Sequence, residues 1–180
     1  LKICHRDLKP ANILVNERTK EVKICDFGSA KKLMQGEVSL AYICSRHYRA
    51  PELIMGCINY TCAVDMWAAG CIVAEMVKKS TLFAGDSNTE QFDEIMKVLG
   101  SPSADDIKGM NPNYNYQPKY TRKPSIPFSR LFGRNPQDEP LISFLEKVLV
   151  YNPKKRLTPS EALAHPYFDS LRNSHLQDKK

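Results

Sequence analysis

The stretch that decides the interpretation of this chain lies at residues 5–12, which read His5-Arg6-Asp7-Leu8-Lys9-Pro10-Ala11-Asn12. Two short apolar runs follow it, at residues 13–15 and 22–25. A polar turn at residues 16–21 separates the two runs, and this pattern is typical of two short strands joined by a tight connection. The sequence therefore predicts a β-hairpin directly after residues 5–12.

The ends of this hairpin carry residues that can bind a metal. Asn12 precedes the first run and Asp26 follows the second, so the hairpin should bring them to face each other. Asp7 lies one loop upstream of both. Oxygen ligands in this arrangement suit Mg²⁺, which binds one or two protein carboxylates together with substrate phosphates and water. The stretch therefore predicts a site for Mg²⁺ and a nucleotide.

Length and composition indicate one globular domain. The chain has 180 residues, of which 42% are hydrophobic and 26% are charged, enough to bury roughly 70% of the unfolded surface. It has no apolar run of 18 residues and no signal-peptide pattern at its start, so we expect a soluble protein with no membrane partner. The expected location is the cytoplasm, with the nucleus left open. The first residues, Leu1-Lys2-Ile3-Cys4, suggest a piece of a longer protein.

Cysteine spacing and net charge limit the classes of binding partner that we expect. The six cysteines are irregularly spaced and form no C-x-x-C pair, which favours buried cytosolic thiols over a disulfide framework. The net charge of +6 favours anionic partners. The sequence has neither a basic stripe interleaved with aromatic residues nor metal-finger spacing, so nucleic acid is not expected. Phosphorylated protein is the better anionic partner.

The rest of the chain should be mainly α-helical. Residues 29–49 show no sustained periodicity and predict a long loop of the kind that is often functional. Residues 101–137 predict an ordered, loop-like insertion with one short helix, and the tail after residue 172 is polar. Helices are expected at about 61–78, 87–99, 104–110, 138–150 and 158–164, and the end of another helix at 1–4.

One polar residue stands out within the longest of these helices. The run at residues 66–74 is apolar nearly all round, which predicts a central, buried helix. Asp65 lies at the edge of this run. A carboxylate on a buried helix must be satisfied, and we expect the backbone N–H groups of a neighbouring loop to do so.

Residues 5–12, together with Asp26-Phe27-Gly28 and Ala50-Pro51-Glu52, resemble the signature of eukaryotic protein kinases in both content and order. The closer similarity is to the glycogen synthase kinase 3, or shaggy-like, branch. It extends over nearly the whole chain and is carried by residues 26–31, 42–52, 85–87, 97–100 and 110–114. Ala11 is also found in mitogen-activated kinases, so a mitogen-activated or cyclin-dependent-like serine/threonine kinase is the alternative.

The resemblance implies the large, mainly helical C-terminal lobe of the kinase fold over residues 1–172. In it, residues 5–12 are the catalytic loop, and residues 29–49 are the activation loop. The glycine-rich loop, the strand lysine and the helix glutamate that precede the catalytic loop in kinases have no match here. The smaller N-terminal lobe is therefore expected to be absent from this chain, and the isolated chain to be inactive or nearly so. Residues 173–180 are the polar tail.

Two residues of the catalytic loop take part in phosphate transfer in kinases. The resemblance implies that Asp7 accepts the proton of the substrate hydroxyl, a role worth about 10²–10⁴ in rate. It also implies that Lys9 lies beside the transferred phosphoryl group, as in serine/threonine rather than tyrosine kinases. The alternatives are a loop-capping Asp7 and a solvated Lys9.

Four further residues are implied to bind the cofactors, Mg²⁺ and ATP. Asn12 and Asp26 would hold two Mg²⁺ ions that neutralise the developing charge on the phosphate. Leu14 would form the floor under the adenine ring, and Cys25 would line the same pocket. The alternative for Leu14 and Cys25 is that both are core residues of the hairpin.

Three residues are implied to be structural. Glu52 and Arg156 resemble the buried ion pair with which the family joins the end of the long loop to the last helices. Removing one partner would leave an unpaired buried charge, at a cost of ~3–5 kcal/mol. Asp65 would brace the catalytic loop from the buried helix.

The substrates are implied to be phosphorylated in advance. In mitogen-activated relatives a phosphothreonine in the long loop neutralises the arginine of the catalytic loop, but here the corresponding residue is Leu40. Arg6 and Lys31 would then bind a phosphate already present on a primed protein substrate, a few residues C-terminal to the target. The alternative is that both are ordinary surface charges.

Two regulatory features complete the resemblance. Tyr42 matches the loop tyrosine that the family autophosphorylates, and it could then pair with Arg46 or Arg49; the alternative is a plain packed tyrosine. Residues 87–99 and 111–120 resemble the groove in which animal relatives dock a helical scaffold peptide.

The groove departs from the family at one position. Phe92 and Ile95 are apolar, but Asp93 is acidic where the family has an apolar residue.

The competing class of function is a non-catalytic kinase-like lobe that acts as a binding module. The presence of Asp7, Asn12 and Asp26 favours the enzyme.

Overall fold

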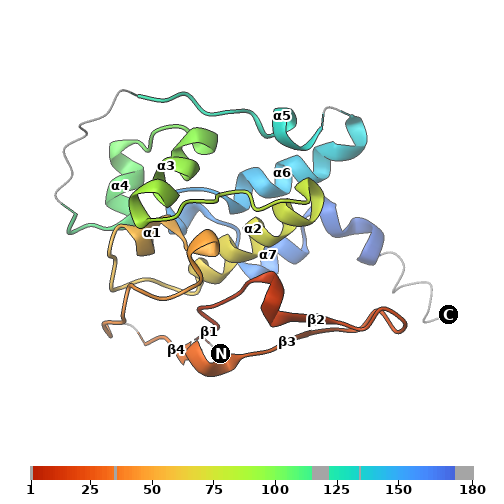
Figure 1. The fold of residues 1–180 in the computed structure, drawn as a ribbon, viewed down its shortest axis with the longest axis horizontal. Helices are drawn as coiled ribbons and strands as arrows, with labels where there is room; N and C mark the ends of the chain where they lie inside the picture. The colour runs from red at the N-terminus through yellow and green to blue at the C-terminus, as the bar shows by residue number, and fades with distance from the viewer. Residues whose placement is uncertain (1, 35, 115–121, 134, 173–180) are drawn as a thin grey trace.

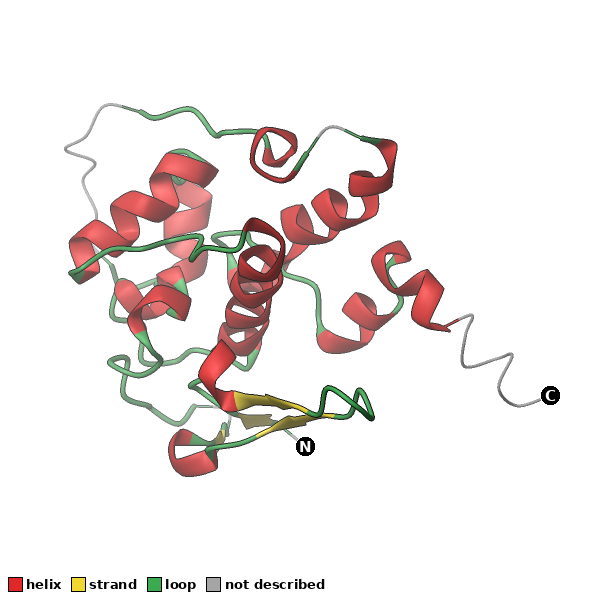
Figure 2. Cartoon of the chain, turned by 45° about the vertical axis from the view of Figure 1, so that its right-hand side comes forward, coloured by secondary structure: helices red, strands yellow, loops and turns green. Residues whose placement is uncertain are grey.

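The computed structural model describes residues 2–34, 36–114, 122–133 and 135–172. Over these residues the chain is mainly helical, with two small antiparallel sheets at one edge (Figures 1 and 2). None of the described helices is long and apolar enough to span a bilayer. The strands are β1 (Ile3–Cys4), β2 (Ile13–Val15), β3 (Val22–Ile24) and β4 (Lys31–Lys32); the α-helices are α1 (Pro51–Ile54), α2 (Ala63–Lys78), α3 (Asn88–Leu99), α4 (Ala104–Met110), α5 (Phe128–Phe132), α6 (Glu139–Val148) and α7 (Pro159–Leu163).

The predicted hairpin is confirmed. Strands β2 and β3 pair antiparallel, with Ile13 opposite Ile24. In the turn, the Asn16 side chain accepts hydrogen bonds from the backbone N–H groups of Arg18 and Thr19, both at 3.0 Å. An asparagine that bonds its own downstream backbone in this way stabilises a tight turn.

The helix end expected at residues 1–4 is wrong. Ile3 and Cys4 form strand β1, which pairs antiparallel with β4, and Cys4 lies opposite Lys31. A segment of four residues is too short to show helical periodicity, and the strand that pairs with it lies far along the sequence. This pairing ties the start of the long loop to the segment that enters residues 5–12.

Helix α2 is central and buried, as predicted. Its buried residues include Val64, Trp67 and Cys71, and the Trp67 ring stacks on Phe83 with centroids 5.6 Å apart. Gly70 lies against helix α6, where an added Cβ would come within 2.8 Å of Val148. A glycine at this point therefore lets the two helices approach closely.

Local capping signals locate the other predicted helices. The Ser87 side chain accepts the N–H of Glu90 at the start of α3, although the Glu90 carboxylate bonds Asp86 instead of closing the capping box. Thr158 and Glu161 form a complete capping box at the start of α7. Such side chains satisfy N–H groups that a helix start leaves unpaired.

The insertion at 101–137 is more structured than expected. Helix α4 is present, but Phe128 and Phe132 also lie in a helix, α5, which contacts α6. Both rings are buried, and they pack edge to face at 5.8 Å. Because α5 has only five residues, its periodicity is too short to detect, and burial of the two rings stabilises it.

The ion pair between Glu52 and Arg156 is present and buried. Two guanidinium nitrogens of Arg156 lie 2.6 Å from the two carboxylate oxygens of Glu52, and neither side chain is more than 1% exposed. Arg156 also donates to the carbonyls of Val150, Ala63 and Tyr151. A buried charge pair is tolerated when such extra hydrogen bonds satisfy its donors.

Glu52→Ala should destabilise the full-length protein by ~3–5 kcal/mol, because Arg156 would keep its buried charge without a partner. Urea unfolding measures the loss. The control is Asp105→Asn, which breaks an exposed ion pair with Lys155 at 2.7 Å and should leave the midpoint nearly unchanged. Equal shifts for the two variants would contradict the structural role of the buried pair.

Candidate active site

Asp65 in the first turn of α2 holds the first two residues of the predicted catalytic loop, residues 5–12. Its two carboxylate oxygens accept the backbone N–H groups of His5 and Arg6, at 2.7 and 2.9 Å. Arg6 has a φ of +67°, in the left-handed region that residues other than glycine rarely adopt. The hydrogen bonds expected of a carboxylate on a buried helix are thus made, and they hold a strained backbone.

His5 connects the catalytic loop to the Asp-Phe-Gly segment. Its Nε2 lies 3.0 Å from the Cys25 carbonyl, and its Nδ1 is 3.3 Å from the backbone nitrogen of Asp7. A carbonyl only accepts and a backbone N–H only donates, so these contacts fit a neutral ring protonated on Nε2. The ring also packs edge-on against Phe27 at 5.0 Å. His5 therefore orients both segments.

Asp7 is held in place from several sides. Its carboxylate accepts hydrogen bonds from the Lys9 ammonium and from both the N–H and the hydroxyl of Ser45, each at 2.8 Å. Burial alone would raise the pKa of Asp7, but the hydrogen bonds from Lys9 and Ser45 outweigh it and hold the pKa below its ordinary value. Asp7 is therefore an ionised, oriented acceptor at neutral pH.

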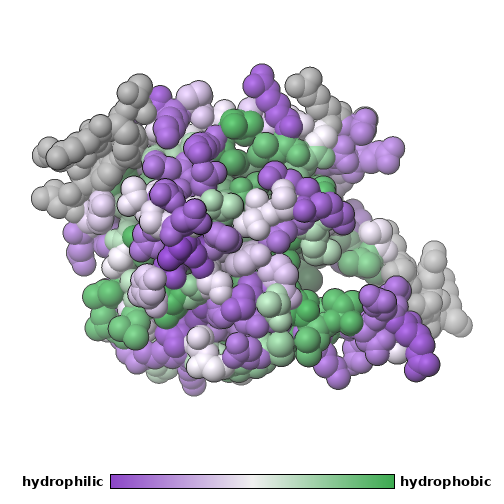
Figure 3. Space-filling view, viewed as in Figure 1, coloured by the Kyte–Doolittle hydropathy of each residue, from purple (hydrophilic) through white to green (hydrophobic). Residues whose placement is uncertain are grey.

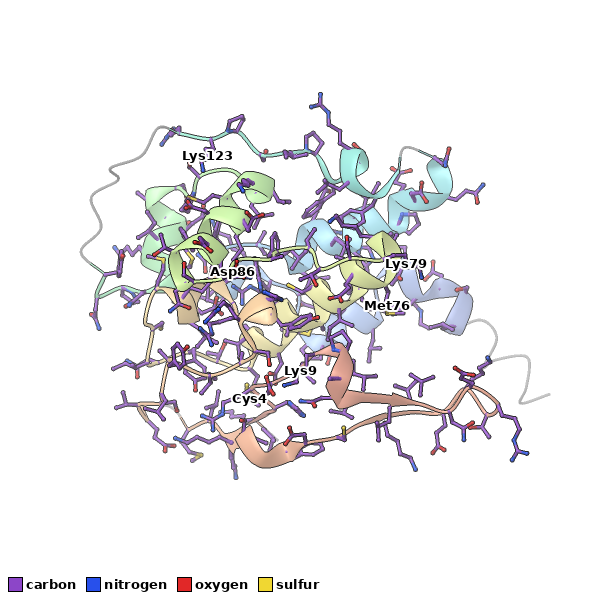
Figure 4. All side chains as sticks on the ribbon, viewed as in Figure 1. Cys4, Lys9, Met76, Lys79, Asp86 and Lys123 are labelled. Atoms are coloured by element: carbon purple, nitrogen blue, oxygen red, sulfur yellow. The ribbon has the colours of Figure 1, made fainter. Side chains whose placement is uncertain are left out.

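Lys9 lies in the space between the helical body and the hairpin (Figure 4). Besides its ion pair with Asp7, its ammonium group donates to the Ser45 hydroxyl at 3.0 Å. Ser45 belongs to the long loop, 38 residues beyond Asp7. The three side chains form one polar cluster that joins the long loop to the catalytic loop.

Asn12 and Asp26 flank the open end of the hairpin, as predicted. The backbone N–H of Cys25 donates to the Asn12 carbonyl at 3.0 Å. The Asn12 amide nitrogen donates to the Asp7 carbonyl at 2.9 Å. Asp26 is exposed, with a left-handed φ of +60°, and its carboxylate accepts the Gly28 N–H at 3.3 Å.

These two residues fit Mg²⁺ bound together with a nucleotide. Among the described residues, no group of three or more His, Cys, Asp or Glu could hold a metal. One amide oxygen and one exposed carboxylate match an ion that takes most of its ligands from phosphates and water. Asn12 and Asp26 could therefore hold the ion only with the nucleotide present.

Leu14 and Cys25 differ in their surroundings. Leu14 is 55% exposed on β2, so the interpretation of Leu14 as a core residue of the hairpin is wrong. Cys25 is half-buried where the hairpin meets Asp26. The adenine-binding role of both residues stays a prediction.

A separate cavity of about 590 Å³ lies near the start of α2, with Leu33, Met66 and Leu157 in its walls. Asp7, Asn12 and Asp26 do not line it. The catalytic assignment therefore depends on the hydrogen-bond geometry of these residues and not on a large pocket.

Arg6 points toward the long loop. Its guanidinium donates to the Ser29 carbonyl at 2.5 Å and to the Tyr60 hydroxyl at 3.1 Å. The Tyr60 hydroxyl in turn donates to the Leu40 carbonyl at 3.0 Å. Arg6 is thus linked through Tyr60 to Leu40, the residue predicted to correspond to the phosphothreonine of mitogen-activated kinases.

Lys31 lies near the same part of the long loop. Its ammonium donates to the Ser39 hydroxyl at 3.1 Å and pairs with the Glu37 carboxylate at 2.7 Å. The β1–β4 pairing sets Lys31 opposite Cys4, two residues before Arg6. The two cations predicted to bind a substrate phosphate therefore extend from neighbouring backbone segments.

Tyr42 is exposed and lies among arginines. The guanidinium carbon of Arg49 is 4.4 Å from the centre of the ring. Hydrogen bonds from Arg46 and Arg49 lower the pKa of the Tyr42 hydroxyl. A phosphate on Tyr42 would meet these cations, and phosphopeptide mapping of the active protein would test that prediction.

The apolar residues of the predicted docking groove face inward. Ile95 is fully buried, and the Phe92 ring packs against Tyr151 with centroids 6.1 Å apart. The Asp93 carboxylate oxygen Oδ1 lies 3.9 Å from the Lys123 ammonium nitrogen in an exposed ion pair. Part of the range 111–120 lies outside the described residues. Scaffold docking stays a prediction, without an apolar surface from Phe92 and Ile95 to support it.

With this geometry established, comparison with known proteins identifies the family. A model of the protein kinase domain matches residues 1–168. The chain belongs to the protein kinase family. It is 49% identical over 172 residues, or 95% of its length, to protein kinase gsk3 of Schizosaccharomyces pombe, and spans 44% of that relative. The resemblance to protein kinases, and to the glycogen synthase kinase 3 branch, is confirmed.

The sequence did not reveal three residues that shape this site: His5 as an orienting group, Ser45 and Tyr60. The fixed spacing of His5 two residues before Asp7 was a usable signal. Ser45 contacts Asp7 across 38 residues of sequence, and Tyr60 contacts Arg6 across 54. A lone serine or tyrosine in an aperiodic segment carries no local signal of such contacts.

Asp65→Ala should loosen the catalytic loop, because the N–H groups of His5 and Arg6 would lose a charged acceptor worth about 1.5–3 kcal/mol each. Hydrogen exchange at these two amides should accelerate about 10- to 100-fold. Asp106→Ala, which removes an N-terminal capping contact with Ser103 in α4, should leave exchange at His5 and Arg6 unchanged. Unchanged exchange in the Asp65 variant would refute the bracing role.

Proposed function

We propose that the full-length protein is a serine/threonine protein kinase that transfers the γ-phosphate of ATP to serine or threonine hydroxyls of protein substrates. The observation that carries this proposal is the ionised Asp7 carboxylate, oriented by Ser45 and Lys9. A positioned base in the catalytic loop of a protein kinase accepts the substrate hydroxyl proton. Lys9, at the position typical of serine/threonine kinases, supports that substrate class.

Each residue has a separate task in the proposed transfer. Asp7 takes the proton as the substrate oxygen attacks the γ-phosphorus, and the bond from that phosphorus to the bridging oxygen breaks, so that ADP leaves. Lys9 places its positive charge near the transferred group. Mg²⁺, when bound with ATP, neutralises the charge that develops on the phosphates. Asn12 and Asp26 would hold the ion there with their amide and carboxylate oxygens.

The described helices would form the large lobe of such a kinase. Leu14, Val15, Val22 and Ile24 on the hairpin are each at least half exposed, and Figure 3 shows apolar side chains over this edge. An exposed apolar patch commonly marks a surface that another part covers. We infer that a second lobe covers the hairpin and completes the ATP site, so the isolated chain should transfer little phosphate.

The substrates would be primed. Arg6 reaches the Leu40 carbonyl through Tyr60, and Lys31 donates to the neighbouring Ser39 hydroxyl. Leu40 itself has no hydroxyl that could carry a phosphate of the protein's own. A phosphoserine a few residues C-terminal to the target hydroxyl would supply the missing anion.

Asp7→Asn in the full-length protein should lower kcat by about 10²–10⁴, because the amide cannot accept the proton. The KM for ATP should change little, since Asp7 is not among the proposed metal ligands. Steady-state assays with a primed peptide measure both constants, with Asp105→Asn as the charge-matched control. Full retention of activity would refute the assignment of Asp7. Absence of activity in the unaltered full-length protein would favour the non-catalytic binding module.

Lys31→Ala should raise the KM for a primed peptide several-fold and leave the KM of the matching unphosphorylated peptide unchanged. The reason is that only the primed peptide carries the phosphate that Lys31 would bind. Measuring both KM values at low and high salt checks the charge dependence. If primed and unprimed peptides are turned over equally by the unaltered protein, the priming hypothesis is wrong.

A further inference from the structure

The two cations proposed for the substrate phosphate differ in what they already bind. Arg6 donates to a carbonyl and to a hydroxyl, both neutral groups. Lys31 instead forms an ion pair at 2.7 Å with the carboxylate of Glu37. Among the described contacts, therefore, one half of the phosphate pocket already holds an anion of the protein's own.

The local backbone favours this contact. A turn brings the chain back after β4, where the N–H of Glu37 donates to the Met34 carbonyl at 3.2 Å. Gly36 in this turn has a φ of +82°, which suits glycine. Beyond the turn, the Ser39 N–H donates to the Ile58 carbonyl at 2.8 Å. The turn and this anchor hold Glu37 within reach of Lys31.

The Lys31–Glu37 ion pair is strong enough to compete with a substrate anion for Lys31 but weak enough for a phosphate to displace it. The side chains of Lys31 and Glu37 are 29% and 45% exposed, and a pair this exposed to solvent changes the affinity for a competing anion by only about two- to fivefold. A phosphoserine carries about −1.5 to −2 charges and three acceptor oxygens, so it can bind Lys31 and Arg6 together. A carboxylate carries a single charge and only exchanges with Glu37.

We propose that Glu37 is an internal competitor that occupies Lys31 until a substrate phosphate displaces it. The proposal rests on the proposed function of Arg6 and Lys31 as the phosphate pocket. Displacement costs the free energy of the Lys31–Glu37 pair, which lowers the affinity for every anion by the same factor. A phosphoserine binds strongly enough to displace Glu37 from Lys31, whereas a single glutamate or aspartate in the peptide does not.

The test compares Glu37→Gln and Glu37→Ala with the unaltered full-length protein. The peptides carry phosphoserine, glutamate or serine at the priming position and are otherwise identical. Both variants should lower the KM of the phosphoserine peptide about two- to fivefold, the factor that corresponds to an exposed ion pair. The glutamate peptide should gain by a similar factor. The kcat values and the KM of the serine peptide should stay unchanged.

Two controls separate local competition from a general change in charge. Asp105→Asn removes one negative charge from an exposed pair of the same length, 2.7 Å, and should not change the KM of the phosphoserine peptide. Inorganic phosphate should inhibit turnover of that peptide more strongly in the Glu37 variants than in the unaltered protein. Glu37→Asp, which keeps the charge on a shorter side chain, should give a smaller gain than Glu37→Gln.

The outcomes distinguish this inference from the proposed function. If the unaltered protein prefers the phosphoserine peptide and Lys31→Ala removes that preference, but the Glu37 variants change nothing, the competitor role is refuted and the pocket stands. An equal gain for the serine peptide, or an equal effect of Asp105→Asn, also refutes it. If the unaltered protein has no preference for the phosphoserine peptide, the pocket and the competitor are both refuted.

Discussion

The hydrogen bonds that Asp65 accepts from His5 and Arg6 are the constraint on which the site depends. Asp65 lies at the start of α2, the longest of the described helices, and packing of that helix against α6 fixes the carboxylate in space. Two charged hydrogen bonds then offset the left-handed conformation of Arg6, a backbone state that costs of order 1–3 kcal/mol. A rigid helix thereby determines the path of a loop that has little regular structure of its own.

The hydrogen bonds from Asp65 also direct the charged side chains of Arg6 and Asp7 to different partners. With the Arg6 backbone in its left-handed state, its side chain reaches Ser29 and Tyr60. The next residue, Asp7, turns its carboxylate to Lys9 and Ser45. Because the two residues are adjacent, any shift in the backbone held by Asp65 would move both side chains together. In the proposed function, binding of the substrate phosphate by Arg6 and proton transfer to Asp7 would therefore be coupled through one peptide unit.

The parts of this structure that could be predicted from sequence are those with local causes. The hairpin follows from two short apolar runs and a polar turn, and the helix starts follow from Ser87 and Thr158, because caps and turns depend on residues a few positions apart. Strand β1 and helix α5 could not be predicted, since two or five residues have no periodicity and are stabilised by distant partners. For the same reason Ser45 and Tyr60 became visible only in the fold.

Strand β1, which the sequence did not predict, positions the charged side chains of the proposed phosphate pocket. Pairing of Cys4 with Lys31 sets the lysine beside the segment that continues into Arg6 and Asp7, and the turn after β4 returns Glu37 to Lys31. A phosphate that replaced Glu37 would then join β4 to the Arg6 side chain by charge-assisted bonds. Such a bridge would reinforce the backbone that Asp65 already holds through its hydrogen bonds to His5 and Arg6. A phosphate bound there would therefore stabilise the position of Asp7 without touching it.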